Sequence, residues 1–359
     1  MHAFIATVPF TILEAVNYVI ENKIEDADIY VVNVFAGADK TAERIKKTGI
    51  FENVFFMDDV LLTYPITLKK CINVVCNGKK FIKNNKRKYK YVYYNNSGWL
   101  INSIFYTCFY RNNQEIKNVF LEHGYYSYTK DYSKKPWYLR LLINVMGLKC
   151  MDGSMLDKIE MFHPELMKIR HDGVLEKMPK VNKSDNTLKC ALDEIFEYIP
   201  EDDEFTSKDI IIFEQGQQKF DFDKDEFWNR VFEIIDKDRA VVKAHPRQKE
   251  STLSGKGIAI SSNHTIPWEV EIMNVDIHKK VQITIFSGAC VSPKLLFDEE
   301  PIVIFLYKLL PVETSVWGED MIKFANELGN TYRDKSKYFI PETFEEFEEY
   351  CKKIGIGRK

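Results

Sequence analysis

The stretch that decides the fold is "HAFIATVPFTILEAVNYVIENK", residues 2–23. It begins with a short apolar run typical of a buried strand, and then places hydrophobic residues on one face of a helix. The next segment, "ADIYVVNVF" (27–35), is again a strand, and a polar helix that Gly49 can end follows it. Strand and helix alternate from residue 2 onward, which predicts a parallel sheet covered on both faces.

The alternation runs to "IKNVFLEHG" (116–124), weakens after residue 150 and restarts at "IIIFEQGQ" (210–217). An acidic, proline-containing segment, "YIPEDDEFTSKD" (198–209), lies between the two series and suits an interdomain linker. We therefore predict an α/β protein with two Rossmann-like, doubly wound domains that face a central cleft.

The predicted domains cover residues 1–200 and 201–359, a division that suits a chain this long for a single core. The last helix, within "PETFEEFEEYCKKIG" (341–355), could pack back on the first domain.

The composition argues against several classes of protein. A formal net charge of −3 is unlike that of nucleic-acid binders, which usually have a basic excess. The 7 cysteines are scattered, which fits reduced cytosolic thiols, and no Cys/His grouping has zinc spacing. No window approaches about 18 uncharged apolar residues, and "MHAFIATVPF" lacks the features of a signal peptide. We expect a cytoplasmic protein without a bound metal.

Polar residues that directly follow predicted strands are the candidates for a site. In an open α/β sheet, ligands bind in the crevice beyond the carboxyl ends of the strands. Four such positions stand out: "EHG" (122–124), "EQGQ" (214–217), "HPR" (245–247) and "SGA" (287–289). No GxGxxG follows the first strand and no P-loop motif occurs in the sequence.

His245 stands at the end of the strand in "VVKAHPRQ" (241–248), flanked by Lys243 and Arg247. Pro246 restricts the residue before it to extended conformations, so the imidazole is held in one direction. With cations beside it, the imidazole can donate to a phosphate and stabilise the charge of a leaving group. The alternative is a turn that happens to contain a histidine.

The other candidates also allow a functional and a structural role. Glu122 can take a proton from a hydroxyl acceptor, or it can cap a turn. Ser287 begins a strand-to-helix junction whose N–H groups can bind a phosphate, or it is simply the N-cap. Glu269, in "IPWEVEIMN" (266–274), suits the two hydroxyls of a ribose, or it favours the helix dipole. The glycine in "EQGQ" can let backbone amides approach a ligand.

Taken in order, "EHG", "HP", "PWE" and "SG" resemble the motifs of a known family. Glu122 and His245 lie 123 positions apart, Glu269 follows 24 positions later, and Ser287 follows 18 positions after that. The set is similar to that of the bacterial sialyltransferases of glycosyltransferase family 52, which have a two-Rossmann architecture of GT-B type. Members of that family also open with a strand and a turn like that in "IATVPFTILEA" (5–15).

The resemblance implies an inverting, metal-independent sialyltransferase without a cofactor, in which the domain at 1–200 binds the acceptor and the domain at 201–359 binds the CMP-sugar. It would move sialic acid from CMP-sialic acid to a galactose-type terminal hydroxyl of a capsule or lipooligosaccharide glycan, in an α-2,3 linkage. Glu122 would be the general base on the acceptor, and His245 would contact the CMP phosphate and act as acid to the leaving nucleotide. The implied nucleotide-binding residues are Gly216, Gln217, Pro246, Arg247, Pro267, Trp268, Glu269, Ser287 and Gly288, and the implied acceptor-binding residues are Thr7, Pro9, His123 and Tyr125.

The chain departs from the family pattern at two positions. His123 replaces the second acidic residue, and Gly288 stands where a second serine is common. The first change can reassign the base to the histidine, and the second leaves phosphate binding to backbone amides. Asp221 and Asp223, in the acidic run "FDFDKDEF" (220–227), are further candidates for the base, unless they only begin a solvated helix.

Other functions stay open on the sequence. The same fold could use a UDP- or GDP-hexose, or the chain could be a non-catalytic protein of polysaccharide assembly. The segment "SKKPWYLRLLINVMGLK" (133–149) combines basic residues with Trp137 and an apolar run, which predicts peripheral contact with an anionic membrane. The alternative for this segment is a buried helix. The oligomeric state is open, with a dimer among the options.

Overall fold

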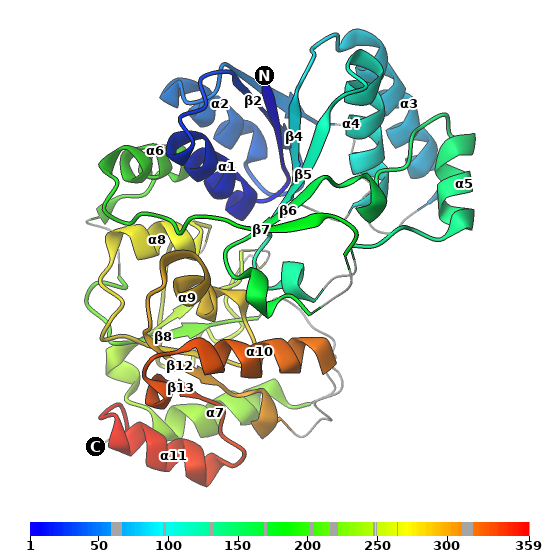
Figure 1. Cartoon of the computed structure of the whole chain (residues 1–359). Helices are drawn as coiled ribbons and strands as arrows, with labels where there is room; N and C mark the ends of the chain where they lie inside the picture. Colours follow the sequence, from blue (N-terminus) through cyan, green and yellow to red (C-terminus); the bar gives the residue numbers. More distant parts are fainter. Residues whose placement is uncertain are drawn as a thin grey trace. The chain divides into compact units, whose positions relative to one another are not determined.

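The computed structural model describes residues 1–58, 67–95, 98–129, 132–168, 171–200, 204–215, 222–246, 248, 250–263, 265–310 and 319–358. The chain forms two compact units (Figure 1). The first unit comprises Met1–Pro179 and Asp185–Ile195, and the second comprises Lys180–Ser184 and Phe196–Lys359.

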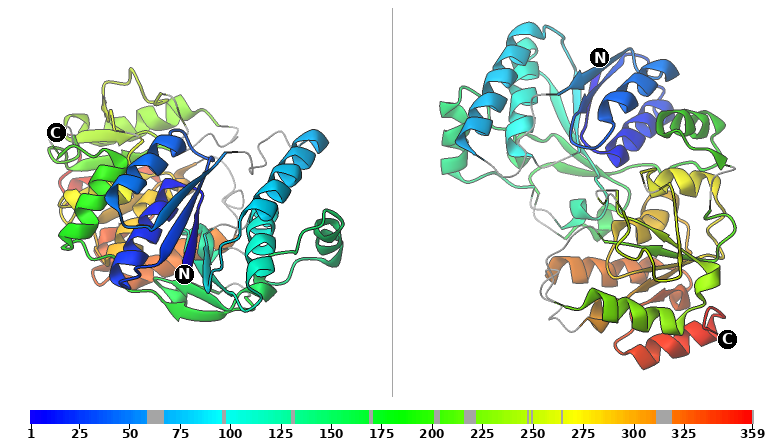
Figure 2. Two further views of the ribbon diagram at one scale, coloured as in Figure 1. Left: turned by 90° about the horizontal axis from the view of Figure 1, so that it is seen from above. Right: turned by 180° about the vertical axis from the view of Figure 1, so that it is seen from behind.

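The first unit is a seven-stranded parallel sheet with strand order β3-β2-β1-β4-β5-β6-β7. Helices α1 and α2 cover one face, and α3 and α4 cover the other (Figure 2). In chain order the elements are β1 (His2–Ala6), α1 (Pro9–Glu21), β2 (Ala27–Val32), α2 (Ala38–Thr48), β3 (Asn53–Met57), α3 (Leu68–Asn84), β4 (Tyr91–Tyr94), α4 (Trp99–Asn112), β5 (Lys117–Leu121), α5 (Trp137–Val145), β6 (Lys158–Met161), β7 (Val174–Lys177) and α6 (Asn186–Phe196).

The second unit is a six-stranded parallel sheet with strand order β10-β9-β8-β11-β12-β13. In both units the chain therefore builds outward from a first strand in one direction and then in the other, which is the doubly wound arrangement. The elements are β8 (Ile210–Phe213), α7 (Lys224–Ile234), β9 (Ala240–Lys243), β10 (Ala259–Ile260), α8 (Trp268–Asn274), β11 (Val281–Thr284), α9 (Ser292–Phe297), β12 (Ile302–Phe305), α10 (Glu319–Thr331), β13 (Tyr338–Phe339) and α11 (Phe344–Lys353).

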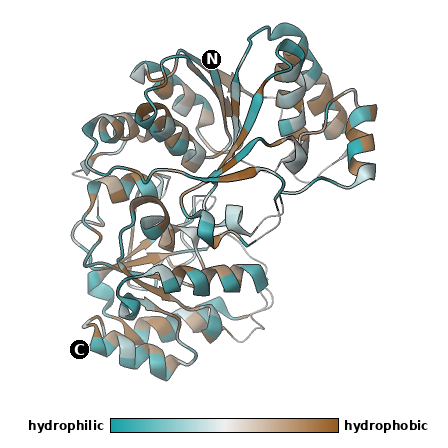
Figure 3. Ribbon diagram, in the orientation of Figure 1, coloured by the Kyte–Doolittle hydropathy of each residue, from teal (hydrophilic) through white to brown (hydrophobic). Residues whose placement is uncertain are grey.

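The central strands form the core of each sheet. Every residue of β2, β8, β9 and β11 is buried, as expected for parallel strands covered on both faces. The helices carry both hydrophobic and hydrophilic faces (Figure 3), so each can pack one side on the sheet and turn the other to water. The prediction of two parallel, doubly wound α/β domains is confirmed.

Local chemistry explains where several helices begin and end. Pro9 is the first residue of α1, where a missing N–H costs nothing, and Thr11 accepts hydrogen bonds from the N–H groups of Thr7 and Val8. Gly49 ends α2 with a φ of 68°, a conformation that glycine adopts without strain. In the last helix, α11, Phe344 lies 5.8 Å from the Phe227 ring of α7, so this helix packs on its own unit.

Candidate active site

The candidate site lies at the carboxyl ends of the strands of the second sheet. β8 and β11 are neighbours, and the chain leaves them toward opposite edges of the sheet. At such a switch point the loops diverge and leave a crevice for a ligand. Glu214, His245 and Ser287 follow β8, β9 and β11 within three residues, so three of the four predicted strand ends lie along one edge of one sheet.

The loops after β8 and β11 are joined across this switch point. The side-chain amide of Gln215 donates a hydrogen bond to the carbonyl of Phe286. One layer deeper, the Thr284 hydroxyl donates to the Phe213 carbonyl at 3.0 Å. Ser287 is therefore held beside the first residues of the "EQGQ" turn. The turn's other two candidates, Gly216 and Gln217, lie outside the described residues, as do Arg247 and Asp221.

His245 lies half-buried in a closed turn beyond β9. Its backbone N–H donates to Oε1 of Gln248 at 3.1 Å, and the Gln248 N–H donates to the His245 carbonyl at 2.8 Å. Pro246, inside this turn, is exposed. These bonds fix the backbone of His245, and the residue as a whole is only half-buried. An imidazole that meets a phosphate needs such partial exposure.

Lys243 is buried, although it lies only two residues before the half-buried His245. It is the last residue of β9, and its side chain is 5% exposed. Its ammonium group lies 3.0 Å from a carboxylate oxygen of Glu271 and donates to the Asn263 carbonyl at 3.0 Å. The cation that the sequence places beside the imidazole is thus committed to a buried ion pair.

The "PWE" motif forms the start of α8 and is buried. Pro267 is the N-cap position, and the Trp268 ring packs edge-on against Phe205 and Phe213, with centroids 5.5 and 5.0 Å away. The Glu269 side chain is also enclosed, and burial raises the pKa of its carboxyl above the ordinary value of 4.5. The hydrogen bond from Ser292 and the charge of Lys243 oppose that rise.

Ser292 connects the "PWE" motif with the "SG" motif. Its hydroxyl contacts the Glu269 carboxylate and also the carbonyl of Gly288, at 3.3 Å from the latter. Ser287 is half-buried and caps the short helical turn Gly288–Cys290 by accepting the N–H of Ala289 at 3.3 Å. Two motifs that lie far apart in sequence therefore share one hydroxyl group.

The fourth strand end lies in the first unit, after β5. There the neighbours Glu122 and His123 differ in how deeply they are buried. Glu122 is fully buried, and its carboxylate accepts hydrogen bonds from the Tyr128 hydroxyl and from the Phe162 N–H, the latter at 2.8 Å. His123 is only half-buried, and its ring lies 6.1 Å from that of Phe10 in an edge-on contact. The acid is therefore enclosed in the interior, whereas the histidine beside it is partly exposed.

The remaining acceptor candidates lie near β1 and β5. Thr7 is buried directly after β1, and Pro9 opens α1. Tyr125 is half-buried, and its ring stacks on that of Tyr126 with centroids 4.6 Å apart. Of the acidic candidates in "FDFDKDEF", Asp223 is the N-cap of α7 and accepts the N–H groups of Asp225 and Glu226. The helix-start interpretation is therefore confirmed for Asp223.

Two residues that the sequence interpretation overlooked contact the candidate site residues or their hydrogen-bond partners. Ser292 joins the "PWE" and "SG" motifs, and a Ser-Pro pair at a helix start was its signal. His163 follows β6, and its N–H donates to the Tyr128 hydroxyl at 3.2 Å, next to Glu122. Its ring nitrogen Nδ1 lies 2.7 Å from Glu165. His163-Pro164 repeats the dipeptide that singled out His245, so the same pattern could have found it.

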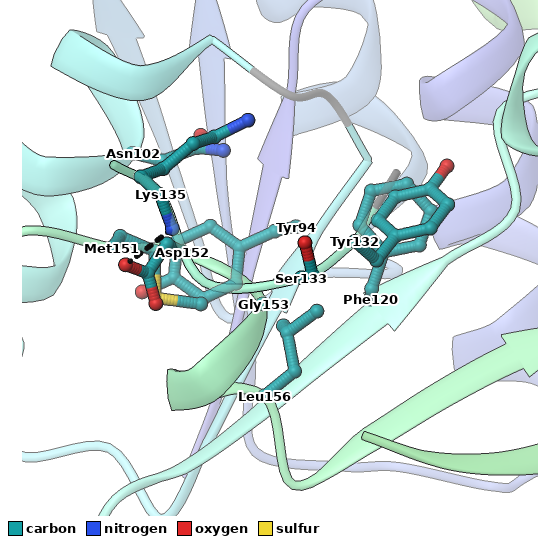
Figure 4. A pocket seen from close by; sticks show the side chains of 10 residues that line it. All are labelled: Tyr94, Asn102, Phe120, Tyr132, Ser133, Lys135, Met151, Asp152, Gly153 and Leu156. Carbon is teal, nitrogen blue, oxygen red and sulfur yellow. Dashed lines mark hydrogen bonds between the residues drawn. The ribbon is translucent and has the colours of Figure 1, made fainter. Parts of the chain in front are cut away.

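The described residues of the first unit line a small cavity and a larger groove. A cavity of about 40 Å³, lined by residues that include Tyr94, Phe120 and Asp152 (Figure 4), is large enough for a water molecule and too small for a sugar. A groove of about 730 Å³ lies where His2 and Lys158 begin β1 and β6, at the amino end of the sheet. The "EHG" motif lies at the opposite, carboxyl end of this sheet, after β5.

Among the described residues, no group of three or more His, Cys, Asp and Glu side chains could hold a metal ion. In the same part of the chain, none of the helices has the length and apolar content needed to cross a bilayer.

No protein-family model matches this chain, and no curated protein does. Solved structures do resemble it. The glycotransferase of kitacinnamycin aligns with a TM-score of 0.53 and 8% identity, over 98% of this chain and 90% of that chain. UDP-N-acetylglucosamine 2-epimerase aligns at 0.46 and 12% identity over 99% and 94% of the two chains. Arabidopsis thaliana UGT89C1, complexed with UDP, aligns at 0.47 and 8% identity over 99% and 94%.

At 8% identity the first alignment shows a shared fold and nothing about the reaction. The chain thus has two parallel-sheet α/β domains of the kind found in GT-B glycosyltransferases, as the sequence predicted.

Proposed function

We propose that this chain is an inverting, metal-independent sialyltransferase. It would transfer sialic acid from CMP-sialic acid to a galactose-type terminal hydroxyl of a bacterial surface glycan, in an α-2,3 linkage. The observation that carries the proposal is the edge of the second sheet. There His245 and Ser287 follow strands on either side of β8, and Ser292 links Glu269 to the turn that Ser287 begins.

On the donor side, His245 donates a hydrogen bond or a proton to the CMP phosphate as the bond from the anomeric carbon to the phosphate oxygen breaks. The backbone N–H groups of the Ser287–Gly288 turn bind the same phosphate. Glu269 is the proposed ribose ligand. Because its carboxylate is enclosed, the ribose hydroxyls would take over the hydrogen bond that Ser292 now donates.

On the acceptor side, the sugar hydroxyl attacks the anomeric carbon and loses its proton to a base. Glu122 is the proposed base, following the family pattern. Its carboxylate is closed in by Tyr128 and Phe162, so this role requires the 122–128 segment to open when the acceptor binds. His123 needs no such movement, and it is the competing base.

The donor class can be tested without knowing the acceptor. A nucleotide that binds the folded protein raises its melting temperature by mass action. We expect CMP to raise it more than UDP or GDP, and CMP-sialic acid to be hydrolysed slowly by the protein alone. A larger shift with UDP or GDP would indicate a hexose transferase, and no shift with any of the three would indicate a non-catalytic assembly protein.

The acceptor can then be found among galactose-terminated oligosaccharides. With CMP-sialic acid as donor, we expect one of them to be sialylated, and the product's resistance or sensitivity to a linkage-specific sialidase gives the linkage. CMP binding without transfer to any galactose-terminated acceptor would contradict the acceptor class while leaving the donor class in place.

A further inference from the structure

Helix α5 exposes a continuous apolar face. Most large hydrophobic side chains of this chain are buried, yet five of the nine residues of α5 are large apolar or aromatic residues that are strongly exposed. Their spacing of one, three and four places them on the same side of a helix. They are Trp137 (75% exposed), Tyr138 (63%), Leu141 (54%), Leu142 (46%) and Val145 (77%).

The rest of the unit holds α5 in place without covering that face. Ile143 is its one buried residue. At the start of the helix, Asp152 accepts the N–H of Lys135 at 3.1 Å (Figure 4) and lies 3.7 Å from the guanidinium of Arg140. Beyond its end, the N–H of Lys149 donates to the Thr107 hydroxyl at 2.7 Å. The exposed face is thus part of an ordered helix with fixed ends.

Basic residues lie in the same segment as the apolar face and on the neighbouring helix α3. The segment 133–149 contains Lys134, Lys135, Arg140 and Lys149 and no acidic residue. The end of α5 also lies close to α3, because a Cβ atom at Gly147 would be 3.5 Å from Nζ of Lys79. Figure 1 and Figure 2 show α5 beside α3 and α4 at the margin of the first unit. Lysines 79, 80, 83, 86 and 88, on α3 and the loop after it, are exposed.

We propose that this face of α5, with the lysines around it, docks on an anionic phospholipid bilayer. Trp137 and Tyr138 have the amphipathic rings that favour the headgroup level, and Leu141, Leu142 and Val145 supply the apolar surface that enters the boundary of the acyl chains. The lysines are attracted by the negative surface potential. The inference concerns a surface away from the strand-end motifs, and it does not rest on the proposed donor or acceptor.

Charge favours a bilayer over a second copy of this chain as the occupant. In a symmetric dimer the same patch meets itself. The lysines around α5 would then approach the lysines of the partner, and like charges in contact oppose association. An anionic bilayer can bury the apolar face and attract the lysines at the same time.

The test is flotation of the full chain with two kinds of vesicle, phosphatidylcholine alone and an equimolar mixture with phosphatidylglycerol. We expect flotation with the mixture, weakened by added salt because screening reduces the attraction. Leu141→Ser/Val145→Ser should reduce the bound fraction on the order of tenfold or more by removing apolar surface. Lys79→Gln and Lys134→Gln should each weaken binding about fivefold, from the contribution of one charge near such a surface.

A second readout separates insertion from adsorption by charge. Brominated lipids quench a tryptophan that reaches the acyl chains, so we expect quenching that Trp137→Phe abolishes while flotation persists. The control is Ile199→Ser, which alters an apolar side chain that is 50% exposed outside α5 and should float like the natural chain. Equal flotation of the Leu141→Ser/Val145→Ser variant, or indifference to phosphatidylglycerol, would overturn the proposal. The proposal would also be overturned if the natural chain formed a dimer that Leu141→Ser/Val145→Ser dissociates.

Discussion

The Nζ atom of Lys243 lies 3.0 Å from Oε1 of Glu271, and both side chains are almost completely buried. This ion pair joins the end of β9, two residues before His245, to α8, whose first turn carries Glu269. It therefore ties together the two segments that carry the proposed phosphate and ribose ligands.

Replacing Lys243 with Met should destabilise the fold strongly, because Glu271 would keep a buried charge without its cation. Breaking such a pair typically costs about 3–5 kcal/mol, which denaturant unfolding can measure. Lys243→Met/Glu271→Leu should recover most of that loss. Lys308→Met, in the surface pair with Glu342 at 2.7 Å, should change stability by no more than about 1 kcal/mol. If Lys243→Met and Lys308→Met lower the free energy of unfolding by similar amounts, the buried pair contributes no more to stability than the surface pair does.

His245→Ala should reduce turnover of CMP-sialic acid on the order of 10²-fold, if the imidazole supplies the acid. The affinity for CMP should fall much less, since in the proposed site the N–H groups of the Ser287–Gly288 turn would still bind the phosphate. His278→Ala is a matched control because His278 is exposed and lies in the same unit. Turnover close to normal in the His245 variant would remove the central role of this histidine.

Glu122→Gln should abolish transfer while CMP affinity stays nearly unchanged, and His123→Asn should keep most of the transfer. The amide oxygen of Gln can still accept the Phe162 N–H, so the change removes the base and keeps much of the local structure. If the His123 variant is inactive and the Glu122 variant works, the base lies one residue further along.

Tyr128→Phe distinguishes a base from a structural acid at position 122. The Tyr128 hydroxyl donates to Glu122 and accepts from the His163 N–H. If Glu122 is the base, this variant should retain transfer, since losing a donor makes the carboxylate a stronger base. If Glu122 only holds the segment together, Tyr128→Phe and Glu122→Gln should lower the melting temperature alike, and activity should follow stability.

The raised pKa of Glu269 predicts a pH dependence of stability. Burial makes the folded protein hold this proton more tightly than the unfolded chain does. As pH rises from 4.5, the ordinary pKa, through the higher folded pKa, Glu269 ionises at a cost and the folded state loses stability. The stability of Glu269→Gln relative to the natural chain should therefore increase as pH rises above 4.5 and through the pKa of the folded protein.

Denaturant unfolding at several pH values measures this difference. Ser292→Ala should enlarge the loss of stability that accompanies rising pH. The reason is that the hydrogen bond from Ser292 opposes the rise in the pKa of Glu269. Glu25→Gln, at an exposed position, is the control and should follow the natural chain. A difference between Glu269→Gln and the natural chain that does not vary with pH would contradict the prediction.

Much of the fold is readable in the sequence, because strand and helix periodicities are local. The alternation from residue 2 onward predicts parallel sheets, and the strand-end filter finds Glu122, His245 and Ser287 at the ends where the structure places them. The filter works because the carboxyl ends of parallel strands share one edge of a sheet. It needs the positions of the strands and no knowledge of which strands are neighbours.

What each side chain meets was decided only by the tertiary structure. Lys243 and His245 stand two positions apart in the sequence, yet one lies in a buried ion pair and the other in a half-exposed turn. Likewise the contacts of Ser292 with Glu269 and Gly288 exist only once α8 and α9 pack together. A sequence determines which residues leave a strand, but the order of strands and the packing of helices determine which of them meet.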